Sequence, residues 1–84
     1  MNYYVYMLWS IKSKKIKTYV GYTINLKCRL KKHNLGNGAK STRGRFWKVI
    51  YKRVYKTKSE ALKAEYYLKN NSVLRKKIKN SYVH

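Results

Sequence analysis

The sequence predicts an α/β protein of the α+β type, a three-stranded antiparallel sheet flanked by helices in the order strand, strand, helix, strand, helix, helix. Two observations predict this fold. Three segments are rich in aromatic and β-branched residues, as strands are, and three others carry apolar residues at helical spacing after a capping residue. With 84 residues the chain can bury one modest core, so we expect residues 1–84 to form a single domain.

The expected strands cover residues 3–9, 18–22 and 46–55. Residues 3–9 are apolar or aromatic throughout, which favours a strand buried on at least one face. Residues 10–17 alternate Lys with Ser and Ile, so we expect them to connect the first strand to the second as a hairpin. In residues 46–55 apolar side chains dominate although charges interrupt them, which is typical of the third strand of a small sheet.

The first expected helix spans residues 26–33 and ends before Gly36, which can take the left-handed conformation that closes a helix. One face of this helix holds Leu26, Arg29, Leu30 and His33. Arg29 and His33 are costly to desolvate against a sheet unless they serve a function, so this face is a candidate site. Alternatively, Arg29 extends from the edge of the face and His33 is a favourable cation at the helix C-terminus.

A second expected helix follows Thr57, which forms a capping box with Glu60, and the Glu60 carboxylate is expected to reach back to the Thr57 amide. The apolar face of this helix holds Ala61, Ala64, Glu65 and Leu68. Glu65 is the only other acid in the chain. A lone carboxylate on an apolar face is either paired with a neighbouring Lys or Arg or bound to a metal ion.

The last expected helix spans residues 73–79, after an Asn-Asn-Ser break in which Ser72 is the expected N-cap. Leu74 and Ile78 are expected to face inward. The outward face is either solvated or part of a surface that binds a polyanion, because it holds Arg75, Lys76, Lys77 and Lys79. His84 ends the chain, and we expect no role for it.

The chain carries 22 Lys and Arg against 2 Asp and Glu, a formal net charge of 22 − 2 = +20. Such a surface attracts polyanions, so nucleic acid is the expected partner. An anionic membrane is the competing partner, but it requires a basic amphipathic helix or a lipid signal that the sequence does not offer. Cys28 is the single cysteine, as in proteins of a reducing compartment. We expect a cytoplasmic, nucleoid-associated protein that is a monomer when free, because its copies repel one another.

Residues 37–45 form a basic loop rich in glycine. The loop lacks the glycine spacing of a phosphate-binding P-loop, which excludes a nucleoside triphosphatase of that type. Its cations and hydroxyls are nevertheless suited to hold the phosphates of a nucleic acid. The expected nucleic-acid-binding residues of the loop are Lys40, Thr42, Arg43 and Arg45.

Several motifs are spaced along the expected elements, from the first strand to the second helix: Tyr4-Val5-Tyr6, Tyr19-Val20-Gly21, Arg29 with His33, and Glu65. In this order they resemble the GIY-YIG nuclease family over nearly the whole chain. The basic loop looks most like the small stand-alone bacterial branch of that family, which is similar to the catalytic domain of a eukaryotic structure-specific endonuclease. The chain departs from the family pattern where Tyr4 and Val5 replace Gly and Ile, and where Tyr22 replaces a Lys of some relatives.

The resemblance implies a role for each matched residue. Tyr6 and Tyr19 would be catalytic tyrosines, and at Gly21 the backbone would pass close to the site and its nucleic acid. Arg29 would stabilise charge on the scissile phosphate. His33 would assist proton transfer or orient a tyrosine.

The same resemblance gives Glu65 the role of holding one divalent metal ion. Because Glu60 is expected to cap a helix, a two-metal site with several carboxylates is excluded. One Mg²⁺ ion, or Mn²⁺ in its place, fits a single carboxylate that shares it with substrate phosphate and waters. The general base must then be a phenol, which a cationic site favours in its ionised form, or a histidine. Tyr19 is the first choice and His33 the rival.

These observations lead to the hypothesis of a metal-dependent endonuclease that hydrolyses DNA phosphodiester bonds. The resemblance suggests single-stranded or branched DNA, in repair or recombination, as the substrate. The alternative hypothesis is a non-catalytic basic module that binds nucleic acid, for which the net charge of +20 alone is sufficient. The enzyme would cut DNA in a reaction that needs Glu65, whereas the module would bind DNA without cutting it.

Overall fold

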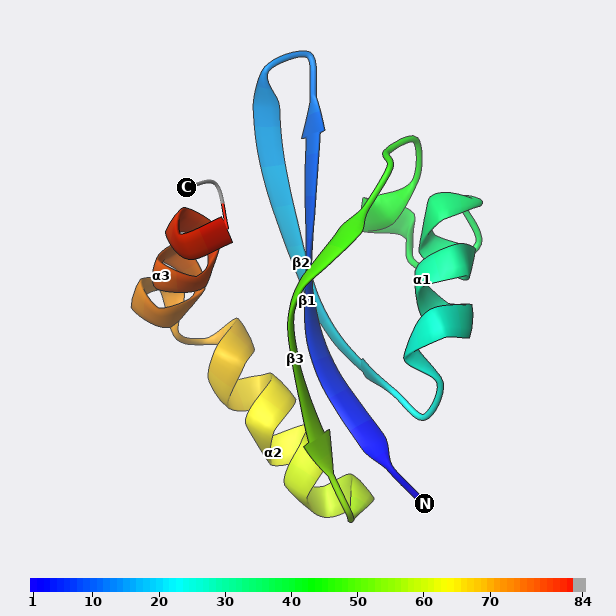
Figure 1. Ribbon diagram of the computed structural model, residues 1–84, viewed down its shortest axis with the longest axis vertical. Coiled ribbons are helices and arrows are strands. Elements are labelled where there is room, and N and C mark those ends of the chain that lie inside the picture. Colours follow the sequence, from blue (N-terminus) through cyan, green and yellow to red (C-terminus); the bar gives the residue numbers. More distant parts are fainter. Residues whose placement is uncertain (83–84) are drawn as a thin grey trace.

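The elements follow the predicted order (Figure 1). The structure, a computed structural model, describes residues 1–82, and His84 lies outside the described residues. Its elements are β1 (Tyr3–Lys12), β2 (Lys15–Thr23), α1 (Leu26–Asn34), a 3₁₀ turn (Lys40–Thr42), β3 (Lys48–Tyr55), α2 (Lys58–Lys69) and α3 (Ser72–Tyr82). The predicted α+β class with a three-stranded antiparallel sheet is confirmed.

The sheet has the strand order β2-β1-β3, and β1 is antiparallel to both neighbours. The predicted hairpin between the first two strands is present, but its loop is shorter than residues 10–17, because the strands continue through residues 10–12 and 15–17 to a tight turn. That turn consists of Ser13 and Lys14, whose φ angles of 52° and 66° suit the twist of a hairpin. Since the side chains of residues 11–17 are exposed, backbone pairing rather than burial extends the two strands.

The sheet separates two small cores, with α1 on one face and α2 and α3 on the other (Figure 1). Successive side chains of a strand point to opposite faces. The core under α2 and α3 contains Val5, Met7, Val20, Ala61 and Leu68. The core under α1 contains Tyr6, Leu8 and Trp47, with Tyr19, Leu26, Leu30 and Val49 packed against it. Because β1 is the central strand, it is buried on both faces. Its Tyr6, from the first tyrosine motif, lies in the core under α1.

The caps of α2 and α3 differ in detail from the prediction. The Thr57 hydroxyl accepts the N–H of Glu60, as expected, but it also donates to the Glu60 carboxylate at 2.9 Å, so the carboxylate meets the hydroxyl rather than the amide. Asn71, not Ser72, caps α3, because its side chain accepts the N–H of Leu74 at 3.0 Å. An Asn side chain can cap as well as a Ser. None of the helices within residues 1–82 is long and apolar enough to cross a membrane.

Candidate active site

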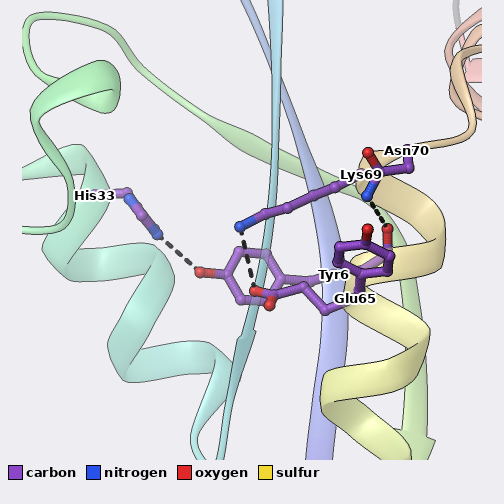
Figure 2. A network of polar contacts seen from close by, with 6 residues as sticks. Tyr6, His33, Glu65, Lys69 and Asn70 are labelled. Carbon is purple, nitrogen blue, oxygen red and sulfur yellow. Dashed lines mark hydrogen bonds and ion pairs between the residues drawn. The ribbon is translucent and has the colours of Figure 1, made fainter.

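Four of the predicted catalytic residues lie together between α1 and the hairpin. A hydrogen bond of 2.9 Å joins the Tyr6 hydroxyl oxygen on β1 to Nε2 of His33 on α1 (Figure 2). The Tyr19 ring on β2 lies 4.9 Å from the His33 ring and 6.4 Å from the Tyr6 ring, measured between centroids. Arg29 lies one helical turn before His33, and its charge lowers the pKa of both Tyr6 and His33. Two motifs on paired strands and two residues on one helical face therefore converge on one cluster.

Gly21 permits this arrangement because it pairs with Tyr6 across the hairpin. A Cβ atom on Gly21 would lie 2.6 Å from the Tyr6 hydroxyl oxygen and 3.0 Å from a carbon of the Tyr19 ring. Such a contact is shorter than van der Waals packing allows, so the position requires glycine. The backbone at Gly21 thus passes directly against the tyrosine cluster, which is the close approach that the resemblance implies.

His33 is fully buried and neutral. Burial lowers its pKa, and the neighbouring Arg29 cation lowers it further. Its second ring nitrogen, Nδ1, lies 2.9 Å from the Thr42 hydroxyl oxygen. Gly38 lies against the ring, since a Cβ atom there would be 2.3 Å from Nδ1. His33 does lie in the last turn of α1, but the alternative interpretation of it as a cation there is wrong, because the ring is buried and both nitrogens are engaged inside the protein.

Tyr6 is a protonated phenol. Burial raises its pKa to about 12, and nearby Tyr19 and Glu65 also raise it, while Arg29 opposes them. Burial therefore outweighs the cation at this phenol. At neutral pH the pair formed by Tyr6 and His33 is uncharged.

Arg29 supplies the positive charge of the cluster. Its Nε–H group is buried and has no hydrogen-bond partner in the described residues, although the side chain as a whole is only half-buried. A buried donor without an acceptor is costly, and an anionic oxygen would satisfy it. Arg29 is thus a half-buried cation with an unsatisfied donor beside Tyr6 and His33.

Glu65 lies on α2, which covers the opposite face of the sheet, and its negative charge raises the pKa of Tyr6. In Figure 2, His33 approaches Tyr6 from α1, while Glu65 and Lys69 extend from α2 toward the same strands. Lys69 Nζ lies 3.7 Å from a carboxylate oxygen of Glu65, whose side chain is 17% exposed against 51% for that of Lys69. The ion pair that the sequence left open is therefore present. It is long and its lysine is half-exposed, so it is a weak interaction that leaves the carboxylate available.

The acids and histidines fit only a simple metal site. Within residues 1–82 no three His, Cys, Asp or Glu side chains come together as metal ligands. Zinc prefers three or four such ligands, so these residues do not suit it. A single carboxylate suits Mg²⁺, which keeps several waters and shares substrate phosphates. Glu65 is the residue of the cluster that can supply that carboxylate.

The basic loop divides into exposed and structural residues. Lys40 and Arg43 are exposed, as residues that bind nucleic acid must be. Arg45 instead donates to the carbonyl oxygens of Ser10 at 3.2 Å and Lys15 at 3.4 Å, which ties the loop to the hairpin. Thr42 is fully buried and its hydroxyl faces His33, so it offers no surface to a phosphate. These two residues serve the architecture of the site in this structure.

Sequence reasoning missed the contributions of Thr42 and Gly38 to the His33 environment. Both lie in an aperiodic loop, so no helical or strand spacing relates them to α1. The available signal was the occurrence of a second glycine after the glycine that closes α1. That glycine indicates a close approach but does not reveal its partner.

The fold and the cluster together define a nuclease-type catalytic domain, and a model of the GIY-YIG catalytic domain matches residues 2–79. The chain belongs to the GIY-YIG family, as the resemblance predicted. The match includes both tyrosine motifs, the polar residues of α1 and Glu65.

The relatives of this chain are bacterial UPF0213 proteins. It is 48% identical to one from Bacillus licheniformis over 66 residues, which cover 77% of this chain and 65% of that protein. It is 49% identical to one from Clostridium perfringens over 70 residues, 82% of this chain and 71% of that protein. The solution NMR structure of a UPF0213 protein from Bacillus halodurans is similar with a TM-score of 0.52 and 37% identity, covering 98% of this chain and 85% of that one. These names state no activity, so they support the family and the fold.

Proposed function

We propose that this protein is a metal-dependent endonuclease that hydrolyses DNA phosphodiester bonds. One observation carries the proposal: a neutral, hydrogen-bonded pair of Tyr6 and His33 lies beside Arg29 and Tyr19. The negative charge of Glu65, on α2, raises the pKa of the same Tyr6. Membership of a nuclease family supports the general class of reaction.

The residues of the cluster match the needs of phosphodiester hydrolysis. The reaction requires an activated water, neutralisation of charge on the phosphate, and assistance to the leaving oxygen. Arg29 would neutralise charge, since its side chain is half-exposed beside the tyrosines and its Nε–H group has no acceptor in residues 1–82. Tyr19 is half-buried, whereas Tyr6 and His33 are buried, so Tyr19 is the group that a water could reach as its general base. His33 would act through Tyr6 rather than on the water.

Nucleases of this family generally use divalent metals, and Glu65 would hold one such ion here, Mg²⁺ or Mn²⁺. When bound, such an ion supplies positive charge at the phosphate and lowers the pKa of a bound water. The ion pair with Lys69 would break when the metal binds. The half-exposed Lys69 side chain could then turn into solvent without disturbing the core. The pairing of Glu65 with Lys69 equally suits the alternative function, a basic module that binds nucleic acid without cutting it.

The substrate proposed is single-stranded or branched DNA, in repair or recombination. The net charge of +20 favours any polyanion, so it supports DNA binding without selecting a DNA structure. On this proposal the protein works as a monomer on the nucleoid.

The test compares the two acids of α2 on a panel of labelled single-stranded, duplex and flap DNA. Glu65→Gln removes the charge at the site and is expected to lower the cleavage rate by about 10²–10³-fold, as the loss of one electrostatic group does. Glu60→Gln is the matched control, because Glu60 caps the same helix away from the cluster. Omission of Mg²⁺ should abolish cleavage by the wild type.

Full cleavage by Glu65→Gln would contradict the proposed role of this carboxylate. Binding of every DNA without cleavage, with Mg²⁺ or Mn²⁺ present, would favour the non-catalytic module. Any cleavage that depends on both the metal and Glu65 supports the enzyme, and the order of substrates then identifies the preferred DNA structure.

A further inference from the structure

The Thr42 hydroxyl contacts three polar groups in a fully buried place. Its oxygen accepts the Ala39 N–H at 3.2 Å, it donates to the Ala39 carbonyl at 2.9 Å, and it lies 2.9 Å from His33 Nδ1. A hydroxyl has one hydrogen and two lone pairs. The one hydrogen is used on Ala39, and one lone pair receives the Ala39 N–H. The remaining lone pair therefore faces Nδ1, which must carry a hydrogen to complete the set.

The hydrogen on Nδ1 also determines the direction of the hydrogen bond between Nε2 and Tyr6. With the hydrogen on Nδ1, Nε2 of His33 has a lone pair, and the Tyr6 hydroxyl donates to it across 2.9 Å. The opposite tautomer would make Nε2 the donor to Tyr6. The buried Tyr6 hydroxyl hydrogen would then have no acceptor among the described residues, and Ala39 would lose the hydroxyl donor. A buried donor without an acceptor is costly, so the first arrangement is favoured.

Arg29 also supports a Tyr6 hydroxyl that donates its hydrogen bond to His33. A guanidinium group only donates hydrogen bonds, and Arg29 lowers the pKa of Tyr6, although burial outweighs this effect. A Tyr6 hydroxyl that donates to His33 keeps its lone pairs for such a donor. Gly38, packed against the imidazole, shows that the same loop also restricts the position of the ring.

We infer that Thr42 is a positioning residue, which holds His33 in the tautomer with hydrogen on Nδ1 so that Tyr6 presents its oxygen lone pairs to Arg29. The consequence for catalysis rests on the proposed function, but the tautomer itself does not. The order of action is Thr42, then His33, then Tyr6, over two hydrogen bonds of 2.9 Å each.

The first measurement is the tautomer of His33 in the full chain with ¹⁵N-labelled histidine. Long-range ¹H–¹⁵N spectra at neutral pH distinguish a protonated ring nitrogen from an unprotonated one, and loss of the signals in His33→Gln separates them from those of His84. We expect a protonated Nδ1 and an unprotonated Nε2 in the wild type. Thr42→Ser, which keeps the hydroxyl, should preserve this pattern, whereas Thr42→Val should abolish it. A wild type with its hydrogen on Nε2 would overturn the inference.

The second measurement is cleavage of the best DNA substrate by the same variants. Thr42→Val is expected to lower kcat at least about tenfold while Thr42→Ser stays close to the wild type, and Ser41→Ala serves as a control for an exposed neighbouring hydroxyl. Unchanged kcat in a folded Thr42→Val would overturn the positioning role even if the tautomer is correct. If the wild type cuts no DNA, the proposed function fails, while the spectra still decide the tautomer. Should Thr42→Val fail to fold, the wild type and Thr42→Ser spectra decide it alone.

Discussion

At the scale of single residues, burial sets the protonation of the site. It raises the pKa of Tyr6 to about 12 and lowers the pKa of His33. Both side chains are therefore neutral at neutral pH, and they form a hydrogen-bonded pair at the centre of the cluster. Arg29 and Glu65 are left as the charged groups that can act on a phosphate or a metal ion. Burial thus explains why the centre of the site is uncharged although the protein as a whole is strongly cationic.

The lowered pKa of His33 predicts how stability depends on pH. Below about pH 6.5, the ordinary pKa of histidine, the unfolded chain binds a proton at this residue that the folded protein does not bind. Stability is therefore expected to fall as the pH drops through that value. Urea unfolding at pH values about one unit above and one unit below measures the change. His33→Gln should lose less stability over the same interval, and an equal loss in both proteins would assign the effect to another group.

At the scale of elements, α1 and the following loop form one unit around His33. The helix supplies Arg29 and His33, and the loop returns to cover the imidazole with Gly38 and Thr42. Gly36 lies between them with a φ of +83°, the left-handed conformation predicted for the residue that closes the helix. The two glycines therefore do different work: Gly36 turns the chain, and Gly38 permits contact with the ring.

This difference predicts distinct effects of the same substitution. Gly38→Ala would place a Cβ atom 2.3 Å from His33 Nδ1, so the ring must move and the bond to Tyr6 is expected to break. Gly36→Ala meets no atom of residues 1–82 within 4 Å, and its cost is the backbone strain of a positive φ, about 1–2 kcal/mol. Thermal unfolding and the His33 ring spectra measure both effects. A Gly38→Ala protein with unchanged His33 signals would contradict the expected displacement.

At the scale of the whole molecule, some arginines are exposed to solvent, whereas others hold segments of the chain together. The net charge of +20 attracts DNA, but an individual cation contributes to binding only where it is exposed. Arg43 is exposed, whereas Arg45 donates to the hairpin carbonyls of Ser10 and Lys15. Two arginines separated by one glycine thus differ: Arg43 is free to meet a polyanion, and Arg45 ties the loop to the hairpin.

Arg43→Met is expected to weaken DNA binding and to reduce its salt dependence by about one phosphate contact, a change of roughly 0.9 in the slope of log K against log salt. Its melting temperature should match that of the wild type, because the side chain is exposed. Arg45→Met should instead lower the melting temperature, since it releases the loop from the hairpin. Binding titrations over a range of salt concentrations and thermal unfolding check both variants. Identical behaviour of the two variants would show that the loop is not tied as described.

The fold class, the family and the residues that share each helical face could be predicted from the sequence. These properties follow from local periodicity and from motifs within single elements, which do not depend on the path of the rest of the chain. Tertiary structure alone decided that His33 bonds to Tyr6, 27 residues away, and to Thr42, nine residues away. It also decided that Arg45 contacts the hairpin and that residues 10–12 pair with residues 15–17 as strands. Such contacts depend on strand register and on the course of an aperiodic loop, and neither is encoded in a repeating pattern of residues.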